Sequence, residues 1–235
     1  ARQVVEQTNL LEERYKSHTE TRELFSVSSQ HYAFVVNAFV SLLKRADMTR
    51  YELFLRETRT YEIIEDVKNF RSEIGVLFLN SYNRDVLTKM FDDNRLTYTS
   101  LFKARPHIFV SKSNPLAKHE VVSLEDLEDF PYLSYDQGIH NSFYYSEEIL
   151  SQIPHKKSIV VSDRATLFNL LIGLDGYTIA TGILNSNLNG DNIVSIPLDI
   201  DDEIDIVYLK HEKATLSKMG EKFLDNLVKE VTFDN

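Results

Sequence analysis

The chain has 235 residues, 43% hydrophobic and 26% charged, a composition typical of a folded globular protein rather than a disordered one. Its 26 Lys and Arg against 36 Asp and Glu give a net charge of −10, which repels phosphate backbones and excludes strong nucleic-acid binding by this chain alone. With no cysteine, disulfides, thiolate metal sites and cysteine nucleophiles are excluded, and a reducing, cytoplasmic location is expected.

The first half of the chain predicts strands alternating with helices. Residues 2–18 lack Gly and Pro and predict a helix, either packed on its own domain or ending a longer coiled-coil linker. A strand is predicted over 23–28, followed by an apolar helix to residue 45, a strand over 51–60, a further helical stretch and a strand over 73–80. We expect no membrane segment, because no apolar run reaches about 18 residues.

A second series of the same kind starts near residue 107. It predicts a strand, Ser123 capping a short helix, a strand over 130–135, a helix through Glu147 and Leu150, a strand over 157–162, a helix over 164–174 and a strand over 176–182. The last strand, 203–211, and the helix 217–231 are expected to rejoin the first series. The predicted fold is therefore α/β with two lobes and a cleft between them.

Polar residues follow three of the predicted strands. Ligands bind outside the carboxyl ends of strands in open α/β sheets, and helix N-termini there attract anions. Capping of the following helix is the simpler alternative for each serine. The side chains predicted to contact a ligand are Ser28, Ser29, Gln30, Phe78, Asn80, Ser134, Tyr135, Asp136, Ser162, Asp163 and Thr181.

Catalysis has little support in the sequence. The seven histidines never pair at metal-ligand spacing, and neither G-x-S-x-G nor G-x-G-x-x-G occurs. The acidic runs 125–130 and 199–205 are more simply solvent-exposed charges. We therefore expect no enzyme activity, no metal and no cofactor.

The helix over 29–43 is more apolar than an ordinary surface helix. Either its own fold buries it or a partner subunit covers its outer face. We expect a dimer, with Phe34 and Ala38 in the interface.

The order of these elements resembles the effector-binding domain of LysR-type transcriptional regulators over essentially the whole chain. The likeness lies in "LFSVSSQHYAFVVNAFVSLL", "EIGVLFLN", "VVSDRATLFNLLIGLDGYTIATG" and, most specifically, "NPLAKHEVVSLEDLEDFPYL". The family's version of "LLIGLDGYTIATG" is richer in glycine, and Asp175 here replaces a small residue.

The resemblance implies a two-lobed, periplasmic-binding-protein-like fold of type II. It implies the end of a linker helix at 1–20, lobe I at 21–101 and 206–235, and lobe II at 102–205. It also implies a small-molecule effector in the cleft, homodimers that form tetramers in the full-length protein, and DNA contact only through a winged helix-turn-helix absent from this chain. The stretch 134–150 resembles a branch that handles sulfur amino-acid supply, so an O-acetylserine-like effector is one hypothesis.

Two other functions share this fold. A solute-binding protein of a transporter would need an export signal or a lipid-anchoring cysteine, and a cytoplasmic enzyme would need a convergent acid, base or nucleophile set. The sequence shows none of these, and it leaves open the effector, the target genes, the hinge positions and whether transcription rises or falls.

Overall fold

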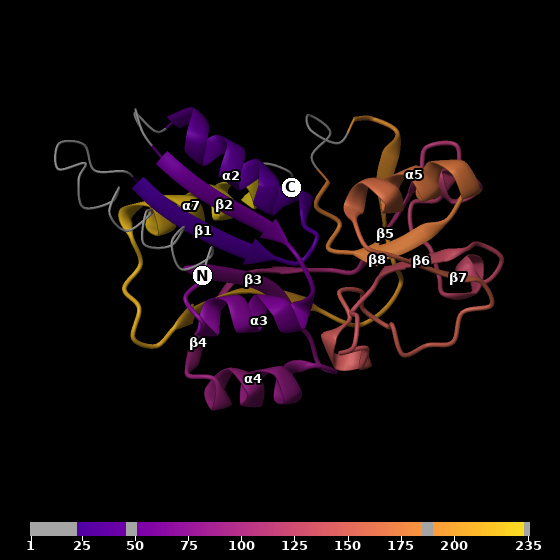
Figure 1. Cartoon of the computed structure of the whole chain (residues 1–235). Helices are drawn as coiled ribbons and strands as arrows, with labels where there is room; N and C mark the ends of the chain where they lie inside the picture. Colours follow the sequence, from indigo (N-terminus) through magenta and orange to yellow (C-terminus); the bar gives the residue numbers. More distant parts are fainter. Residues whose placement is uncertain (1–22, 46–50, 185–189, 233–235) are drawn as a thin grey trace, which may run out of the picture.

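A computed structural model describes residues 23–45, 51–184 and 190–232 and contains two lobes, each built around a five-stranded mixed sheet (Figure 1). The strand order is β2-β1-β3-β10-β4 in lobe I and β7-β6-β8-β5-β9 in lobe II. Both sheets contain parallel pairs and one strand that runs antiparallel to its neighbours, β10 in lobe I and β5 in lobe II. The predicted two-lobed α/β fold is thus confirmed.

Lobe I takes its elements from both ends of the chain. Helices α2 and α7 pack together on one face of its sheet, and α3 and α4 cover the other face (Figure 1). Its elements are β1 (Glu23–Ser29), α2 (Ala33–Arg45), β2 (Tyr51–Glu57), α3 (Thr60–Lys68), β3 (Ile74–Leu79), α4 (Arg84–Asp93), β4 (Leu96–Ala104), β10 (Ile204–His211) and α7 (Lys218–Thr232).

The central strand β3 explains why lobe I has helices on both faces. All six of its residues, "IGVLFL", are buried, as expected for a strand covered on both sides. A Cβ on Gly75 would lie only 2.8 Å from Ile63 and 2.9 Å from Val67 of α3, so glycine permits that helix to approach the sheet closely.

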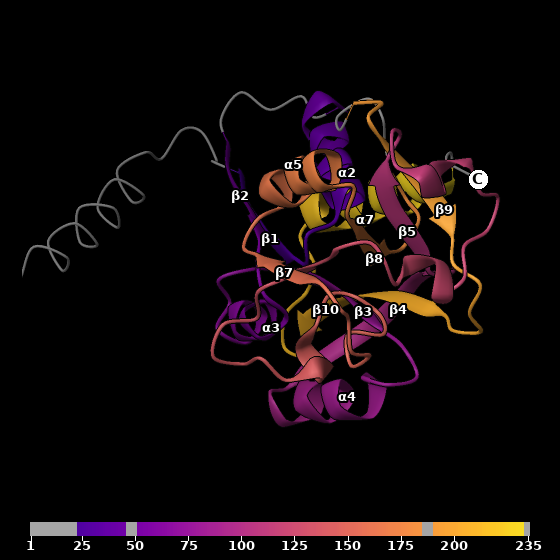
Figure 2. The same ribbon diagram turned by 90° about the vertical axis from the view of Figure 1, so that its right-hand side faces the viewer.

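Lobe II lies between β4 and β10 in sequence, so the chain crosses between lobes twice. Figure 2 views the molecule from the side of lobe II, with α5 in the foreground. Its elements are β5 (His107–Ser111), three 3-10 helices (Pro115–Lys118, Glu125–Leu127 and Phe143–Tyr145), β6 (Tyr132–Tyr135), β7 (Ser158–Val161), α5 (Arg164–Leu174), β8 (Tyr177–Ala180) and β9 (Ile193–Pro197).

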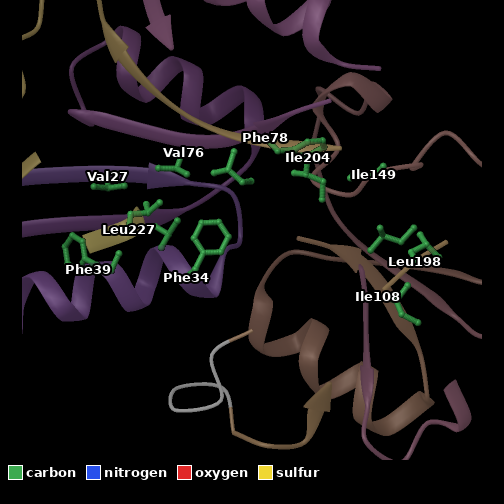
Figure 3. Packing of buried hydrophobic residues seen from close by; sticks show 14 of the residues in the cluster. Val27, Phe34, Phe39, Val76, Phe78, Ile108, Ile149, Leu198, Ile204 and Leu227 are labelled. Carbon is green, nitrogen blue, oxygen red and sulfur yellow. The ribbon is translucent and has the colours of Figure 1, made fainter. Parts of the chain in front are cut away.

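One apolar cluster extends from lobe I into lobe II (Figure 3). Phe34, Val76 and Phe78 belong to lobe I, and Ile108 belongs to lobe II. Ile149 and Ile204 lie between these two groups in the figure. Apolar contact therefore helps to hold the lobes together.

The predicted helix through Glu147 and Leu150 is wrong. A 3-10 helix over 143–145 is followed there by bends and turns. The aromatic run "FYY" has modest helix propensity, and the Glu147 and Glu148 side chains bond to the backbone of distant residues. Helix α4 and strands β4 and β9 were not predicted, and the helix expected over 2–18 lies outside the described residues.

The proposed interface residues of α2 also need correction. Phe34 is 2% exposed and Ala38 is fully buried, and both belong to the chain's own core. Phe34 stacks on Tyr32 and meets Phe102 edge-to-face. The fold itself buries this side of the helix, so these two side chains cannot reach a partner.

Candidate functional site

A cavity of about 50 Å³ lies between the lobes. Lobe I lines it with the start of α2, the end of β3 and the start of β10, and lobe II with β6, β8 and the start of α5. Its apolar side chains include Phe34, Phe78, Phe109, Ile149, Leu167, Phe168, Ile179 and Ile204, and its polar ones are His31, Tyr32, Tyr135, Glu147, Glu148, Arg164, Thr178 and Thr181.

His31 and Glu147 join the two lobes at this cavity. The backbone nitrogen and the ring Nδ1 of His31 each lie 2.9 Å from Glu147 Oε2, and the His31 ring stacks on Tyr135 at 4.1 Å. Burial lowers the pKa of His31, but the hydrogen bond and charge of Glu147 outweigh burial and raise this pKa above its ordinary value. The pair thus favours a protonated imidazole.

Glu148 is a second buried carboxyl at the wall of the cavity. Its Oε1 accepts a hydrogen bond from Tyr135 N at 2.8 Å, and the residue is 4% exposed. Burial, followed by the charge of Glu147, raises the pKa of Glu148 well above its ordinary range. Of the two adjacent carboxyls, Glu147 pairs with His31, and Glu148 has no cationic partner among the described residues.

Gln30 connects the strand ends of lobe I. Its Nε2 donates to Thr60 Oγ1 at 2.7 Å, while its Oε1 accepts from Phe78 N at 3.0 Å and from the Tyr32 hydroxyl at 2.6 Å. The residue is fully buried. Gln30 therefore fixes the chain around the cavity through bonds within lobe I.

Two backbone N–H groups of lobe I bond to side chains of lobe II. Gln137 Oε1 accepts from Thr60 N, the first residue of α3, at 3.1 Å, and Glu147 accepts from the backbone nitrogen of His31, two residues before α2 begins. Gln137 Nε2 also donates to Glu147 Oε1 at 3.0 Å, which links these two contacts. Separating the lobes would leave these N–H groups without their protein partners.

Further polar contacts cross the gap beside these two. Arg59 donates to Asp136 Oδ2 at 2.6 Å and to Asp136 O at 3.1 Å. Arg164 Nε at the start of α5 lies 3.1 Å from Glu57 Oε1 at the end of β2. Tyr61 of α3 stacks on His140 at 3.5 Å. The segment 136–148 of lobe II thus lies against the helix N-termini of lobe I.

The predicted ligand-contacting residues divide into three groups. Phe78, Tyr135 and Thr181 line the interlobe cavity, and Ser134 and Asp136, together with Tyr135, line a separate hollow in lobe II. The others have structural contacts or exposed positions. Ser28 bonds to Asp66 and Ser72, Gln30 bonds within lobe I, Asn80 bonds to Asp202, Asp163 caps α5, Ser162 is exposed, and Ser29 is buried.

Ser28 and Ser29, the last two residues of β1, do not cap α2, because this helix begins only at Ala33. Asp163, predicted to contact a ligand, instead caps α5, since its Oδ1 accepts from Thr166 N at 2.8 Å. Sequence reasoning missed Glu147, Glu148 and Arg164 as cavity residues. The adjacent acidic pair in "SEEIL" is the available signal in the sequence, but this stretch was predicted only as part of a helix.

Metal binding and membrane insertion find no support in the part of the chain that is described. Within 23–45, 51–184 and 190–232, no group of three or more His, Asp or Glu side chains could hold a metal ion. No helix in these same ranges combines the length and apolar character needed to cross a membrane.

Comparisons with known proteins agree on one family. The family model described as the LysR substrate binding domain matches residues 28–232. A search of curated proteins finds no match.

Solved structures resemble this chain at low sequence identity. The effector-binding domain of QuiR in complex with shikimate has a TM-score of 0.58 at 16% identity, covering 89% of this chain and 97% of that one. The effector-binding domain of a BenM variant has a TM-score of 0.60 at 15% identity, covering 90% and 96%. The reduced OxyR regulatory domain from Pseudomonas aeruginosa has a TM-score of 0.63 at 12% identity, covering 88% and 98%. These likenesses support the fold.

Proposed function

The chain belongs to the LysR substrate-binding domain family, and from this premise we propose that it senses a small metabolite in the interlobe cavity and thereby controls DNA binding by a LysR-type regulator. The observation that carries the proposal is the cavity itself, which both lobes line with buried polar groups among apolar side chains. A ligand that contacts both lobes binds one lobe arrangement better than others and shifts their equilibrium.

The effector is proposed to be an amino-acid or sulfur-metabolism intermediate. This follows from the sequence resemblance of residues 134–150 and from a cavity that combines carboxyl, guanidinium and imidazole groups with apolar walls. DNA contact is proposed to be made by a winged helix-turn-helix of the full-length regulator, since this domain carries a net charge of −10.

We also propose that the domain forms a homodimer through the outer face of α2. Val36, Val40 and Leu43 are spaced along one side of the helix and are only partly buried. The neighbouring edge strand β2 exposes Tyr51 and Phe54. An apolar helix stripe beside exposed aromatic rings is the kind of surface that a second subunit covers.

A thermal-shift screen of amino-acid and sulfur metabolites tests effector binding. A cavity ligand at 100 times its Kd should add about 2.7 kcal/mol to the free energy of unfolding. Thr181→Val removes a hydroxyl from the cavity wall and should reduce this shift, whereas Thr215→Val, at an exposed position outside the cavity, should not. Equal shifts in both variants would place the ligand elsewhere.

A further inference from the structure

Glu148 is a carboxyl at the cavity wall that has no cationic partner within the described ranges. The residue is 4% exposed and lines the interlobe cavity, and its Oε1 accepts a hydrogen bond from Tyr135 N at 2.8 Å. Ionised carboxylates are rarely buried unless a positive charge meets them. Glu148 can therefore still accept a hydrogen bond from a positively charged group, because no cationic side chain of the described residues pairs with it.

The other acidic groups beside the cavity each have a partner. Glu147 pairs with His31 at 2.9 Å, and Glu57 pairs with Arg164 at 3.1 Å. An incoming carboxylate would have to displace one of these protein carboxylates from its cation. A ligand with only an anionic group would also meet the charge of Glu147.

Aromatic rings surround the same space. Tyr32, Phe34, Phe78, Phe109, Tyr135 and Phe168 all line the cavity. The face of an aromatic ring attracts an organic cation, and the attraction is stronger where water is excluded. A buried carboxyl together with aromatic walls is a combination suited to an ammonium group on an apolar body.

We propose that the interlobe cavity recognises a small organic ammonium ligand, a primary amine or an amino-acid zwitterion with an apolar body, and that Glu148 accepts its ammonium group. This inference rests on the proposed function, because it assigns a ligand class to the same cavity. Asp136 and Asp163, the two carboxylates among the predicted ligand-contacting residues, instead bond to Arg59 and to the N-terminus of α5.

The protonation of Glu148 gives the proposal a second readout. Burial raises the pKa of this carboxyl, so at pH values below that raised pKa it must release a proton to pair with an ammonium ion. The affinity should therefore rise with pH up to the pKa of Glu148. The titratable or charged groups around it are Tyr32, Tyr132, Tyr135, Glu147, His31 and Arg164.

Two matched compound series test the ligand class by calorimetry on the domain. L-leucine is compared with 3-methylbutylamine and 4-methylpentanoate, and L-phenylalanine with phenethylamine and 3-phenylpropanoate. We expect the amine or the amino acid to bind in at least one series, with proton release measured in buffers of different ionisation enthalpy, and the carboxylate not to bind. Glu148→Gln should weaken binding roughly 10- to 100-fold, because the uncharged amide keeps the bond to Tyr135 N but loses the charge.

Glu128→Gln is the control, since Glu128 is an exposed carboxylate of lobe II that pairs with Lys156. The inference is overturned if the deaminated acids bind as well as the amines, or if Glu148→Gln keeps the wild-type affinity. In both cases the proposed function stands, because a small molecule still binds. If neither series nor any compound of the metabolite screen binds, the inference and the proposed function are both overturned.

Discussion

At the scale of single residues, Ser28 and Ser29 are adjacent and fully buried but differ in their bonds. The Ser28 hydroxyl lies 2.6 Å from Asp66 Oδ2 and 2.7 Å from Ser72 Oγ. The Ser29 hydroxyl has no hydrogen-bond partner among the described residues. Because strand neighbours face opposite sides of a sheet, one serine can anchor α3 while the other does not.

We expect Ser28→Ala to lower the free energy of unfolding by about 1–3 kcal/mol, because it leaves buried partners unsatisfied. Ser29→Ala should change it by less than about 1 kcal/mol, since no bond is lost. Urea unfolding of the two variants measures the difference. Similar losses in both would mean that the Ser29 hydroxyl has a partner, such as a buried water.

The pair of His31 and Glu147 makes a pH-dependent contribution to stability. The pKa of His31 is raised in the fold above its ordinary value of 6.5, so the protonated ring is stabilised there. This stabilisation is fully present below pH 6.5 and is lost as the pH rises through the raised pKa. The loss should therefore occur above the pH at which an unfolded histidine titrates.

Glu147→Gln tests this sign, since the amide oxygen can still accept from the His31 backbone nitrogen but carries no charge. The difference in free energy of unfolding between wild type and Glu147→Gln should be larger at about pH 6 than at about pH 9. Glu128→Gln serves as the matched exposed control and should show no such change across this range. A difference that grows toward pH 9 would contradict a protonated His31.

At the scale of elements, α2 has two faces with different roles. Phe34 and Ala38 are buried against the sheet and α7, and Val40 is partly exposed on the other side. Phe34→Ala should cost about 3–5 kcal/mol of stability by leaving a cavity in the core.

Val40→Glu should leave the fold intact and weaken self-association, because the interface would bury an unpaired charge.

Sedimentation equilibrium combined with thermal unfolding separates these effects. A dimeric Val40→Glu protein with a wild-type dissociation constant would contradict the outer face of α2 as the interface. An unfolded Val40→Glu protein would show that this side chain belongs to the core. A monomeric wild type at high micromolar concentration would contradict the homodimer itself.

Regular periodicity explains which elements could be predicted from the sequence. The alternation in β1 and β10 and the caps and apolar spacing of α5 are local signals, and these elements lie where expected. The segment 136–148 is different, since Gln137 and Glu147 find their partners about 77 and 116 residues away in the chain. Local patterns cannot show such contacts. Phe78, Tyr135 and Thr181 could be predicted because they lie at strand ends, whereas Glu147 and Glu148 could not.

At the scale of the whole molecule, the lobes are joined by two chain crossings and by side-chain contacts from segment 136–148. Arg59 and Gln137 contribute four of these contacts, to Asp136 O and Oδ2, to Thr60 N and to Glu147 Oε1. Three of the four join the lobes directly, and the fourth orients Glu147. Neither residue lines the interlobe cavity, so changing both removes no side chain from its walls.

We expect Arg59→Ala combined with Gln137→Ala to let the ligand-free lobes separate. In the double variant the N-terminus of α3 has already lost its bond to Gln137. Opening of the lobes therefore breaks fewer protein hydrogen bonds than in the wild type, and it lets water bond to the free N–H groups of α3. Because the chain has no cysteine, Lys89→Cys in α4 and Asn169→Cys in α5 provide two exposed sites for spin labels, one in each lobe.

Pulsed electron–electron double resonance measures the distance between the two spin labels. It should give one narrow distance distribution for the otherwise wild-type domain. The double substitution should broaden this distribution and shift it to longer distances. Lys156→Ala, which removes an ion pair within lobe II, should not change it. An unchanged distribution in the double variant would mean that the contacts left in place fix the lobes, namely the His31–Glu147 and Arg164–Glu57 pairs and the apolar contacts of Ile149 and Ile204. Effector binding would then have to break those contacts or act by a movement smaller than lobe opening, because the contacts of Arg59 and Gln137 would not limit it.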